Sequence, residues 1–341
     1  MNLAELNKIA VAMVQPGKGI LAADESSGTI KKRFDAINVE STEDNRRDYR
    51  ELLFRSMDAM KNHISGVILY DETIWQKAKD GTPLVEIIKQ AGSIPGIKVD
   101  EGTKPLPGCP GELITIGLDK LADRLTKYYE QGARFAKWRA VIDIGNGIPS
   151  HASIHANAHA LARYAALCQA AQIVPIVEPE VLMDGDHDID RCYAVTEWVL
   201  KETFLELYYN KVPLEGIVLK PNMAISGKKC AKRASVQEVA EKTVRMLKNC
   251  VPAAVPGIAF LSGGQSDEEA TAHLDAMNKI GGLPWKLTFS YGRALQAAPQ
   301  KAWSGKTENV KAAQGAFSHR ARMNGLASEG RWSSDLEKKA A

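Results

Sequence analysis

Short apolar runs recur along the chain, and each one ends on polar, charged or glycine residues. Between the runs lie stretches with apolar residues at helical spacing. In residues 118–132, for example, Leu118, Leu121, Leu125 and Tyr128 form one stripe that ends at Gly132. The apolar runs occupy residues 19–24, 65–71, 96–100, 133–139, 173–180, 216–220, 257–264 and 286–293. Near-continuous apolar strands that alternate with helices predict a parallel sheet covered by helices.

The number of strands predicts the fold class. Eight strand–helix units in a chain of this length indicate an α/β protein, a single (β/α)8 TIM barrel whose active site lies at the C-terminal mouth of the strands. An open doubly wound sheet is the structural alternative, but no strand is followed by G-x-G-x-x-G. We expect one barrel domain over residues 1–326. Residues 327–341 are small and polar, which predicts a mobile C-terminal tail.

Composition narrows the possible partners and the compartment. The chain has 341 residues, 44 Lys and Arg against 41 Asp and Glu, a net charge of +3, and 45% hydrophobic residues. This balance excludes disordered and fibrous classes and predicts neither a nucleic-acid nor a membrane partner. The N-terminal stretch does not have the pattern of a signal peptide, and no apolar run is long enough to span a bilayer. Five widely spaced cysteines without a C-x-x-C pair indicate reduced thiols in the cytoplasm.

Charged side chains cluster at the predicted strand ends. Residues two apart on a strand share a face, so several charged pairs should point into the barrel together. These pairs are Lys98 with Asp100, Lys137 with Arg139, and Glu178 with Glu180. Lys220 ends another apolar run, and Asp24 ends the first. The cations and carboxylates should therefore converge on the mouth.

Such a set fits Schiff-base chemistry. A buried lysine such as Lys220, close to a second ammonium such as Lys137, would have a lowered pKa and could attack a carbonyl. The carboxylates Asp24, Glu178 and Glu180 would then transfer protons. On the residues alone, unrelated charges at the barrel rim remain the alternative, because an isolated lysine at a strand end usually extends into solvent.

Glycines and hydroxyls after the last two strands indicate a phosphate site. LSGG (261–264) and SYGR (290–293) lie where TIM barrels commonly bind phosphate. Glycine lets backbone N–H groups approach an anion, and Arg293 can bind it through two hydrogen bonds. Arg33, Lys98 and Arg139 could hold a second phosphate across the mouth, although ordinary turns and solvated charges remain alternatives.

Several longer motifs then identify a family. They are GILAADESSGTIKKR, NRRDYRELLF, GIKVDEG, FAKWR, ARYA, IVPIVEPE, DGDHDI, LKPNM, FLSGGQS, LTFSYGRALQ and KAW, in consistent order over residues 18–303. The sequence resembles the class I, Schiff-base-forming fructose-1,6-bisphosphate aldolases. The resemblance implies a cytoplasmic homotetrameric lyase of glycolysis and gluconeogenesis. It would reversibly cleave fructose 1,6-bisphosphate, a phosphorylated sugar, to dihydroxyacetone phosphate and glyceraldehyde 3-phosphate. It would need no metal and no cofactor.

The resemblance also implies a role for each matching residue. Lys220 would form the Schiff base at C2, Glu178 would act as general acid/base, and Glu180 would support the lysine. Lys137 would assist proton transfer, and Asp24 would take the C4 hydroxyl proton. Binding of the 1-phosphate would fall to Ser262, Gly263, Gly292 and Arg293, and that of the other phosphate to Ser26, Arg33, Lys98 and Arg139. Thr29 would belong to the same substrate- and phosphate-binding set. Thr29 stands where some members have serine.

Some expectations stay open. Animal members end in a tyrosine that serves proton exchange at C3, whereas the last aromatic residue here is Trp332. A related aldolase that prefers sedoheptulose 1,7-bisphosphate or fructose 1-phosphate is one alternative, and a non-catalytic phosphate-binding scaffold is another.

His151, His155 and His159 recur every four residues, and without converging carboxylates they predict an exposed histidine stripe rather than a metal site. The basic run at 228–233 predicts a solvated surface.

Overall fold

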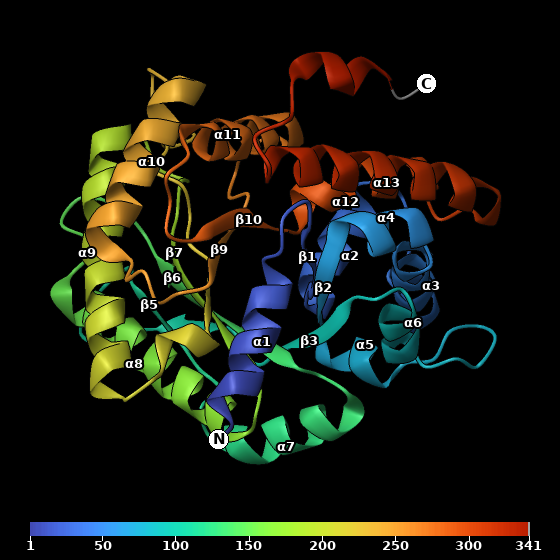
Figure 1. Cartoon of the computed structure of the whole chain (residues 1–341), viewed down its shortest axis with the longest axis horizontal. Coiled ribbons are helices and arrows are strands. Elements are labelled where there is room, and N and C mark those ends of the chain that lie inside the picture. The colour runs from blue at the N-terminus through green and yellow to red at the C-terminus, as the bar shows by residue number, and fades with distance from the viewer. Residues whose placement is uncertain (340–341) are drawn as a thin grey trace.

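The computed structural model describes residues 1–339 and shows a closed parallel barrel surrounded by helices (Figure 1). The strands follow the order β1-β10-β9-β8-β7-β6-β3-β2 around the barrel, so the first and last strands are neighbours. The predicted (β/α)8 TIM barrel is confirmed, and each of the eight predicted runs overlaps one barrel strand. None of the helices in the described residues is long and apolar enough to span a membrane.

The strands are β1 (Gly19–Ala23), β2 (Ile64–Leu69), β3 (Ile94–Lys98), β4 (Thr103–Pro105), β5 (Leu113–Thr115), β6 (Phe135–Ile142), β7 (Val174–Val181), β8 (Val218–Leu219), β9 (Gly257–Phe260) and β10 (Lys286–Tyr291). The α-helices are α1 (Leu3–Met13), α2 (Ser27–Asp35), α3 (Glu43–Phe54), α4 (Met57–His63), α5 (Asp71–Trp75), α6 (Leu84–Gln90), α7 (Leu121–Gln131), α8 (His151–Ala170), α9 (Ile189–Tyr209), α10 (Val236–Cys250), α11 (Asp267–Ile280), α12 (Arg293–Trp303) and α13 (Val310–Ala327). Short 3-10 helices are η1 (Leu214–Gly216), η2 (Thr307–Asn309) and η3 (Ser334–Lys339).

The barrel interior is apolar near the N-terminal ends of the strands. Helix α1 lies across this end and buries Leu6, Ala10 and Met13 against interior side chains of the strands (Figure 1). Those interior residues include Ile20, Phe135, Val174, Ile176, Val218 and Ala259. Side chains alternate along a strand, so the inward-facing positions nearer the C-terminal ends of the same strands carry the charged residues of the mouth. The apolar layers and α1 therefore keep water away from those charges on one side.

The ring of Phe135 fills much of this interior because two neighbouring strands carry glycine beside it. A Cβ atom on Gly96 would lie 2.3 Å from the ring, and one on Gly66 would lie 2.9 Å from it. Both distances are shorter than van der Waals contact. The glycines in the runs SGVILYD and GIKVD thus make room for an aromatic side chain that seals the barrel.

Two parts of the fold lie outside the simple strand–helix alternation. Strands β4 and β5 form a separate antiparallel pair between β3 and β6. After α13, η3 returns to that helix, and Glu337 accepts hydrogen bonds from Arg320 (2.6 Å) and from the Trp332 indole (2.9 Å). The division at residue 326 and the mobility of the tail stay predictions, although these contacts argue against mobility up to residue 337. Residues 340 and 341 lie outside the described residues.

Candidate active site

Every predicted site residue lines one cavity of about 780 Å³ at the C-terminal ends of the strands. They are Asp24, Ser26, Thr29, Arg33, Lys98, Lys137, Arg139, Glu178, Glu180, Lys220, Ser262, Gly263, Gly292 and Arg293. They come from seven of the barrel strands or from the loops and helices that follow them. The structure thus brings the whole set together, while the role of each residue stays a prediction.

Glu178 lies between two buried lysines at the centre of this cavity. Its Oε1 atom is 3.3 Å from Nζ of Lys220, and its Oε2 atom is 3.4 Å from Nζ of Lys137. All three side chains are at most 6% exposed. Lys137 is on β6, Glu178 on β7, and Lys220 directly after β8, so three adjacent strands supply a cation, an anion and a cation. This Oε2 atom is buried and makes no hydrogen bond among the described residues.

Asp24 adds a second negative charge across the barrel. Its carboxylate is 2.8 Å from Nζ of Lys137. Burial by itself would raise the pKa of Asp24, but the charges of Lys137 and Lys220 outweigh it and hold that pKa well below its usual range. Burial would likewise lower the pKa of Lys137, but the carboxylates of Asp24 and Glu178 raise it above its ordinary value. Both groups are therefore charged at neutral pH.

The backbone holds Lys220 at a fixed height in the barrel. Its N–H donates to the carbonyl oxygen of Val177 at 2.8 Å, which extends the pairing of β8 with β7 by one residue. Two residues later, the fully buried Asn222 accepts a hydrogen bond from the N–H of Val181 (2.9 Å) and donates to the Thr196 hydroxyl (3.0 Å). Asn222 was not predicted as a site residue. It acts by positioning the LKPN loop, and polarity alone did not distinguish it from a surface amide.

Two further ion pairs surround the centre. Arg139 pairs with Glu180, and the neighbouring carboxylates keep the pKa of this guanidinium above its ordinary value despite burial. Lys98 lies 3.4 Å from Asp100. Both members of each predicted pair line the same cavity, as expected for residues two apart on one strand.

The loops after β9 and β10 form the predicted phosphate side. Gly263 has a φ of +20°, and a Cβ atom there would lie 2.3 Å from the Met183 methyl group. Helix α12 begins at Arg293, directly after Gly292, so its first N–H groups lie at the edge of the cavity. Free N–H groups at a helix N-terminus favour anions. The exposed Arg293 adds a cation at the same place.

The position of Arg33 does not follow the predicted grouping. A Cβ atom on Gly292 would lie 3.6 Å from Nη2 of Arg33, which places this guanidinium beside the β10 loop. Arg33 also pairs with the buried Glu25, which accepts a hydrogen bond from Gln296 at 2.8 Å. Arg33, predicted for one phosphate, thus lies next to Gly292, which was predicted for the other. Glu25 was not predicted as a site residue, because the prediction assigned the functional roles of this motif to Asp24 and Ser26 on either side of it.

Lys228 is a third residue that the prediction missed. It belongs to the basic run 228–233, for which a solvated surface was expected, yet it lines the cavity and pairs with Asp184 at 2.5 Å. The loop that carries it has no regular secondary structure, so hydrophobic periodicity gave no signal for its position.

Comparison with known proteins assigns the chain to a family. The sequence profile of the fructose-bisphosphate aldolases of class I matches residues 5–341. The chain belongs to the class I fructose-bisphosphate aldolase family. It is thus an aldolase, a lyase of the glycolytic type, and the resemblance seen in the motifs is confirmed.

Named relatives cover nearly the whole chain of this aldolase. A probable fructose-bisphosphate aldolase class 1 of Xanthomonas campestris pv. campestris is 59% identical over 97% of the chain and 99% of the relative. The cytosolic fructose-bisphosphate aldolase 4 of Arabidopsis thaliana is 55% identical over 98% of the chain and 85% of the relative. A solved structure of the Plasmodium falciparum aldolase, in complex with TRAP and a small-molecule inhibitor, is 50% identical. It has a TM-score of 0.95 and covers 97% of this chain and 96% of that one.

The charge balance around Glu178 predicts a stability effect. Glu178→Gln removes the one carboxylate within 4 Å of the Lys220 ammonium among residues 1–339. Because a buried charge that loses its partner is costly, we expect the free energy of unfolding in urea to fall by about 3 kcal/mol.

Asp35→Asn is the matched control, because it breaks an exposed pair of Asp35 with Lys31, whose side chains are 53% and 63% exposed. The expected loss there is below about 1 kcal/mol. Equal stability of Glu178→Gln and the parent aldolase would show that the central charges are not coupled as the distances indicate.

Proposed function

We propose that this aldolase reversibly cleaves fructose 1,6-bisphosphate to dihydroxyacetone phosphate and glyceraldehyde 3-phosphate through a Schiff base on Lys220. The observation that supports it most is the position of Glu178 between the Lys220 and Lys137 ammonium groups inside the cavity. A carboxylate 3.3 Å from Lys220 can take a proton from that amine and return it to a leaving hydroxyl. Lys137 stays charged, because Asp24 and Glu178 raise its pKa, and so it is not the nucleophile.

The proposed steps use only these side chains. The neutral amine of Lys220 attacks the C2 ketone, and protonation of the carbinolamine hydroxyl by Glu178 expels water and leaves an iminium ion. Asp24 takes the C4 hydroxyl proton as the C3–C4 bond breaks, and the electron pair of that bond moves to the iminium nitrogen. Glyceraldehyde 3-phosphate leaves, the enamine takes a proton at C3, and water releases dihydroxyacetone phosphate from Lys220. The iminium accepts the electrons, and metal independence is therefore part of the proposal.

Borohydride trapping tests the nucleophile. With dihydroxyacetone phosphate and borohydride, the parent chain should gain a covalent adduct on Lys220, because borohydride reduces the iminium to a stable amine. Lys220→Ala should lose both the adduct and the cleavage activity, and EDTA should leave the activity of the parent unchanged.

The control is Lys286→Ala, an exposed lysine at the opposite end of β10, which should keep adduct and activity. An adduct on another lysine, or activity that EDTA abolishes without any adduct, would contradict the proposed mechanism. Peptide mass spectrometry locates the adduct.

We further propose that Arg293, with Ser262, Gly263 and Gly292, holds the 1-phosphate, and that Lys98 contributes to the site of the other phosphate. Arg293→Ala should then raise KM about tenfold or more for both fructose 1,6-bisphosphate and fructose 1-phosphate, because a hydrogen bond to a charged group is lost. Lys98→Ala should raise KM only for the bisphosphate. Arg245→Ala, an exposed arginine on α10, is the control. Steady-state kinetics with both sugars give the KM values of the parent and of each variant. If Lys98→Ala raised KM for both sugars and Arg293→Ala raised it only for the bisphosphate, the two phosphate sites would be assigned the wrong way round.

A homotetramer in the cytoplasm is also proposed, on the family membership and on exposed side chains. Tyr208 and Tyr209 at the end of α9 are 75% and 62% exposed, and such aromatic side chains are typical of interfaces. The five cysteines are all free thiols, as a reducing compartment allows. Sedimentation equilibrium should give four times the chain mass, and a monomer at micromolar concentration would refute the assembly; cell fractionation tests the location.

A further inference from the structure

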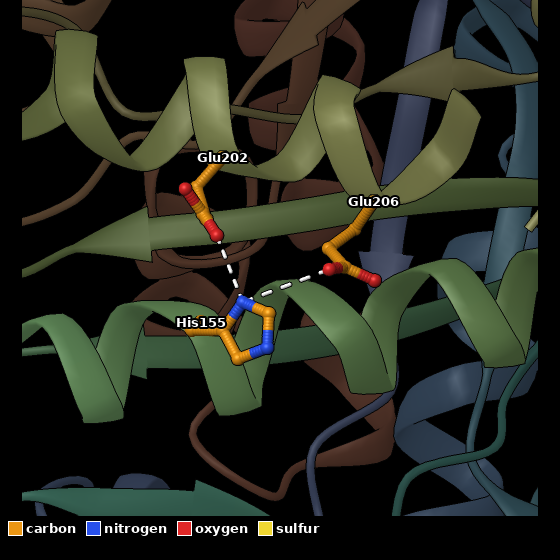
Figure 2. A group of neighbouring side chains, drawn as sticks. All are labelled: His155, Glu202 and Glu206. Atoms are coloured by element: carbon orange, nitrogen blue, oxygen red, sulfur yellow. Dashed lines mark hydrogen bonds and ion pairs between the residues drawn. The ribbon is translucent and has the colours of Figure 1, made fainter. Parts of the chain in front are cut away.

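A histidine and two glutamates, side chains that commonly bind metal ions, lie together on the outer surface between α8 and α9, away from the barrel mouth. Figure 2 shows His155 of α8 facing Glu202 and Glu206 of α9. Nδ1 of His155 is 2.8 Å from Glu202 Oε1 and 3.6 Å from Glu206 Oε1. None of these three residues lines the active-site cavity. The cluster is therefore separate from the proposed chemistry of the aldolase.

The sequence spacing explains why the groups meet. Residues four apart lie on the same face of a helix, and here both helices carry such a pair, His155 with His159 and Glu202 with Glu206. A second contact repeats the first one turn further along, because His159 Nδ1 is 2.9 Å from Glu206 Oε2. The three histidines are exposed, as predicted, but the premise that no carboxylates converge on them is wrong. Each carboxylate lies 47 residues after the histidine that it contacts, on another helix. The local pattern around His155 therefore did not reveal it.

The two carboxylates of this cluster are largely shielded from solvent. The side chain of Glu206 is only 7% exposed and that of Glu202 is 15% exposed. Among residues 1–339, no lysine or arginine lies within 4.0 Å of either carboxylate, and their ion-pair partners are the two histidines. These two carboxylates and the His155 imidazole have oxygen and nitrogen atoms within 4.8 Å of one another, and Glu206 Oε2 also accepts a hydrogen bond from the Asn210 amide at 3.4 Å. Such an arrangement is costly unless a cation joins it.

We propose that His155, Glu202 and Glu206 form a binding site for a divalent transition-metal ion, of which Zn²⁺ is the most suitable. Bonds of 2.0–2.2 Å at tetrahedral angles separate neighbouring ligand atoms by about 3.3 Å. The distances of 2.8 Å and 3.6 Å at His155 bracket that value, and all three ligand atoms lie within 4.8 Å of one another. The imidazole nitrogen favours Zn²⁺ over Mg²⁺, which prefers oxygen ligands.

The remaining contacts of the cluster fit the surroundings of a metal site. Glu206 turns Oε1 toward His155 and Oε2 toward His159, so His159 fixes the orientation of the ligating carboxylate. His155 is 51% exposed, and the solvent side leaves the fourth position to a water molecule. Since the ligands come from two helices, the bound ion would cross-link α8 to α9 and stabilise the folded chain by mass action.

Metal titration of the purified full-length aldolase tests the site. After removal of metals with EDTA and desalting, Zn²⁺ is titrated by calorimetry, and Co²⁺ is used as a spectroscopic probe of four-coordinate geometry. We expect one ion per chain, with a Co²⁺ spectrum that lacks thiolate charge transfer and is unaffected by excess Mg²⁺. His155→Ala and Glu206→Gln should each weaken Zn²⁺ binding about tenfold or more.

The matched control is His151→Ala, which removes a neighbouring histidine of the same stripe that pairs with no carboxylate among the described residues. Its Zn²⁺ affinity should stay within about twofold of the parent value, and its aldolase activity should be unchanged. Circular dichroism checks that each variant is folded. The proposal is overturned if the parent chain, His155→Ala and Glu206→Gln bind Zn²⁺ equally. It is overturned as well if His151→Ala loses the ion while Glu206→Gln keeps it, since the ion would then bind the histidine stripe alone.

Discussion

The active site depends on charge balance inside a closed barrel. Two ammonium groups, Lys137 and Lys220, are removed from most of the solvent, and each needs a nearby negative charge. Glu178 serves both lysines, and Asp24 serves Lys137 from across the barrel. This arrangement works only if adjacent strands keep their register, because a shift by one residue would turn each side chain to the outside.

The apolar half of the barrel maintains that balance. The ring of Phe135 and the helix α1 fill the end opposite the mouth. The charged residues of the mouth therefore lie between the apolar barrel interior on one side and the cavity on the other. Low exposure strengthens each ion pair and lets the cations act on a phosphorylated sugar with less screening by solvent. The net charge of the chain, +3, does not show this local concentration.

Much of the fold and the site could be predicted because both follow local rules. The apolar runs predicted the eight barrel strands, and the alternation of side chains along a strand predicted that Lys137, Arg139, Glu178 and Glu180 face one cavity. Features that depend on distant contacts could not be predicted in this way. Lys228 reaches the mouth from an irregular loop, and β4 and β5 form an added pair of three-residue strands.

The histidines of α8 show the same limit more clearly. Their spacing marked one face of a helix, but the partner of that face was set by how α9 packs beside α8. The positions of Glu25 and Asn222 likewise follow from tertiary hydrogen bonds to residues far along the chain, or to a neighbouring strand. Short-range patterns contain no information about such contacts.

The pairing of β1 with β10 has a consequence for how the molecule forms. Asp24 follows the first barrel strand, whose neighbours are β2 and the last strand, and Glu25 contacts Gln296, 271 residues later. Contacts of such long sequence separation pay a large loop-closure entropy and form late in folding. During synthesis on the ribosome, the strands that carry Lys137, Glu178 and Lys220 are therefore complete long before Asp24 gains its second flanking strand. The mouth is assembled only when the final strand–helix unit joins the first.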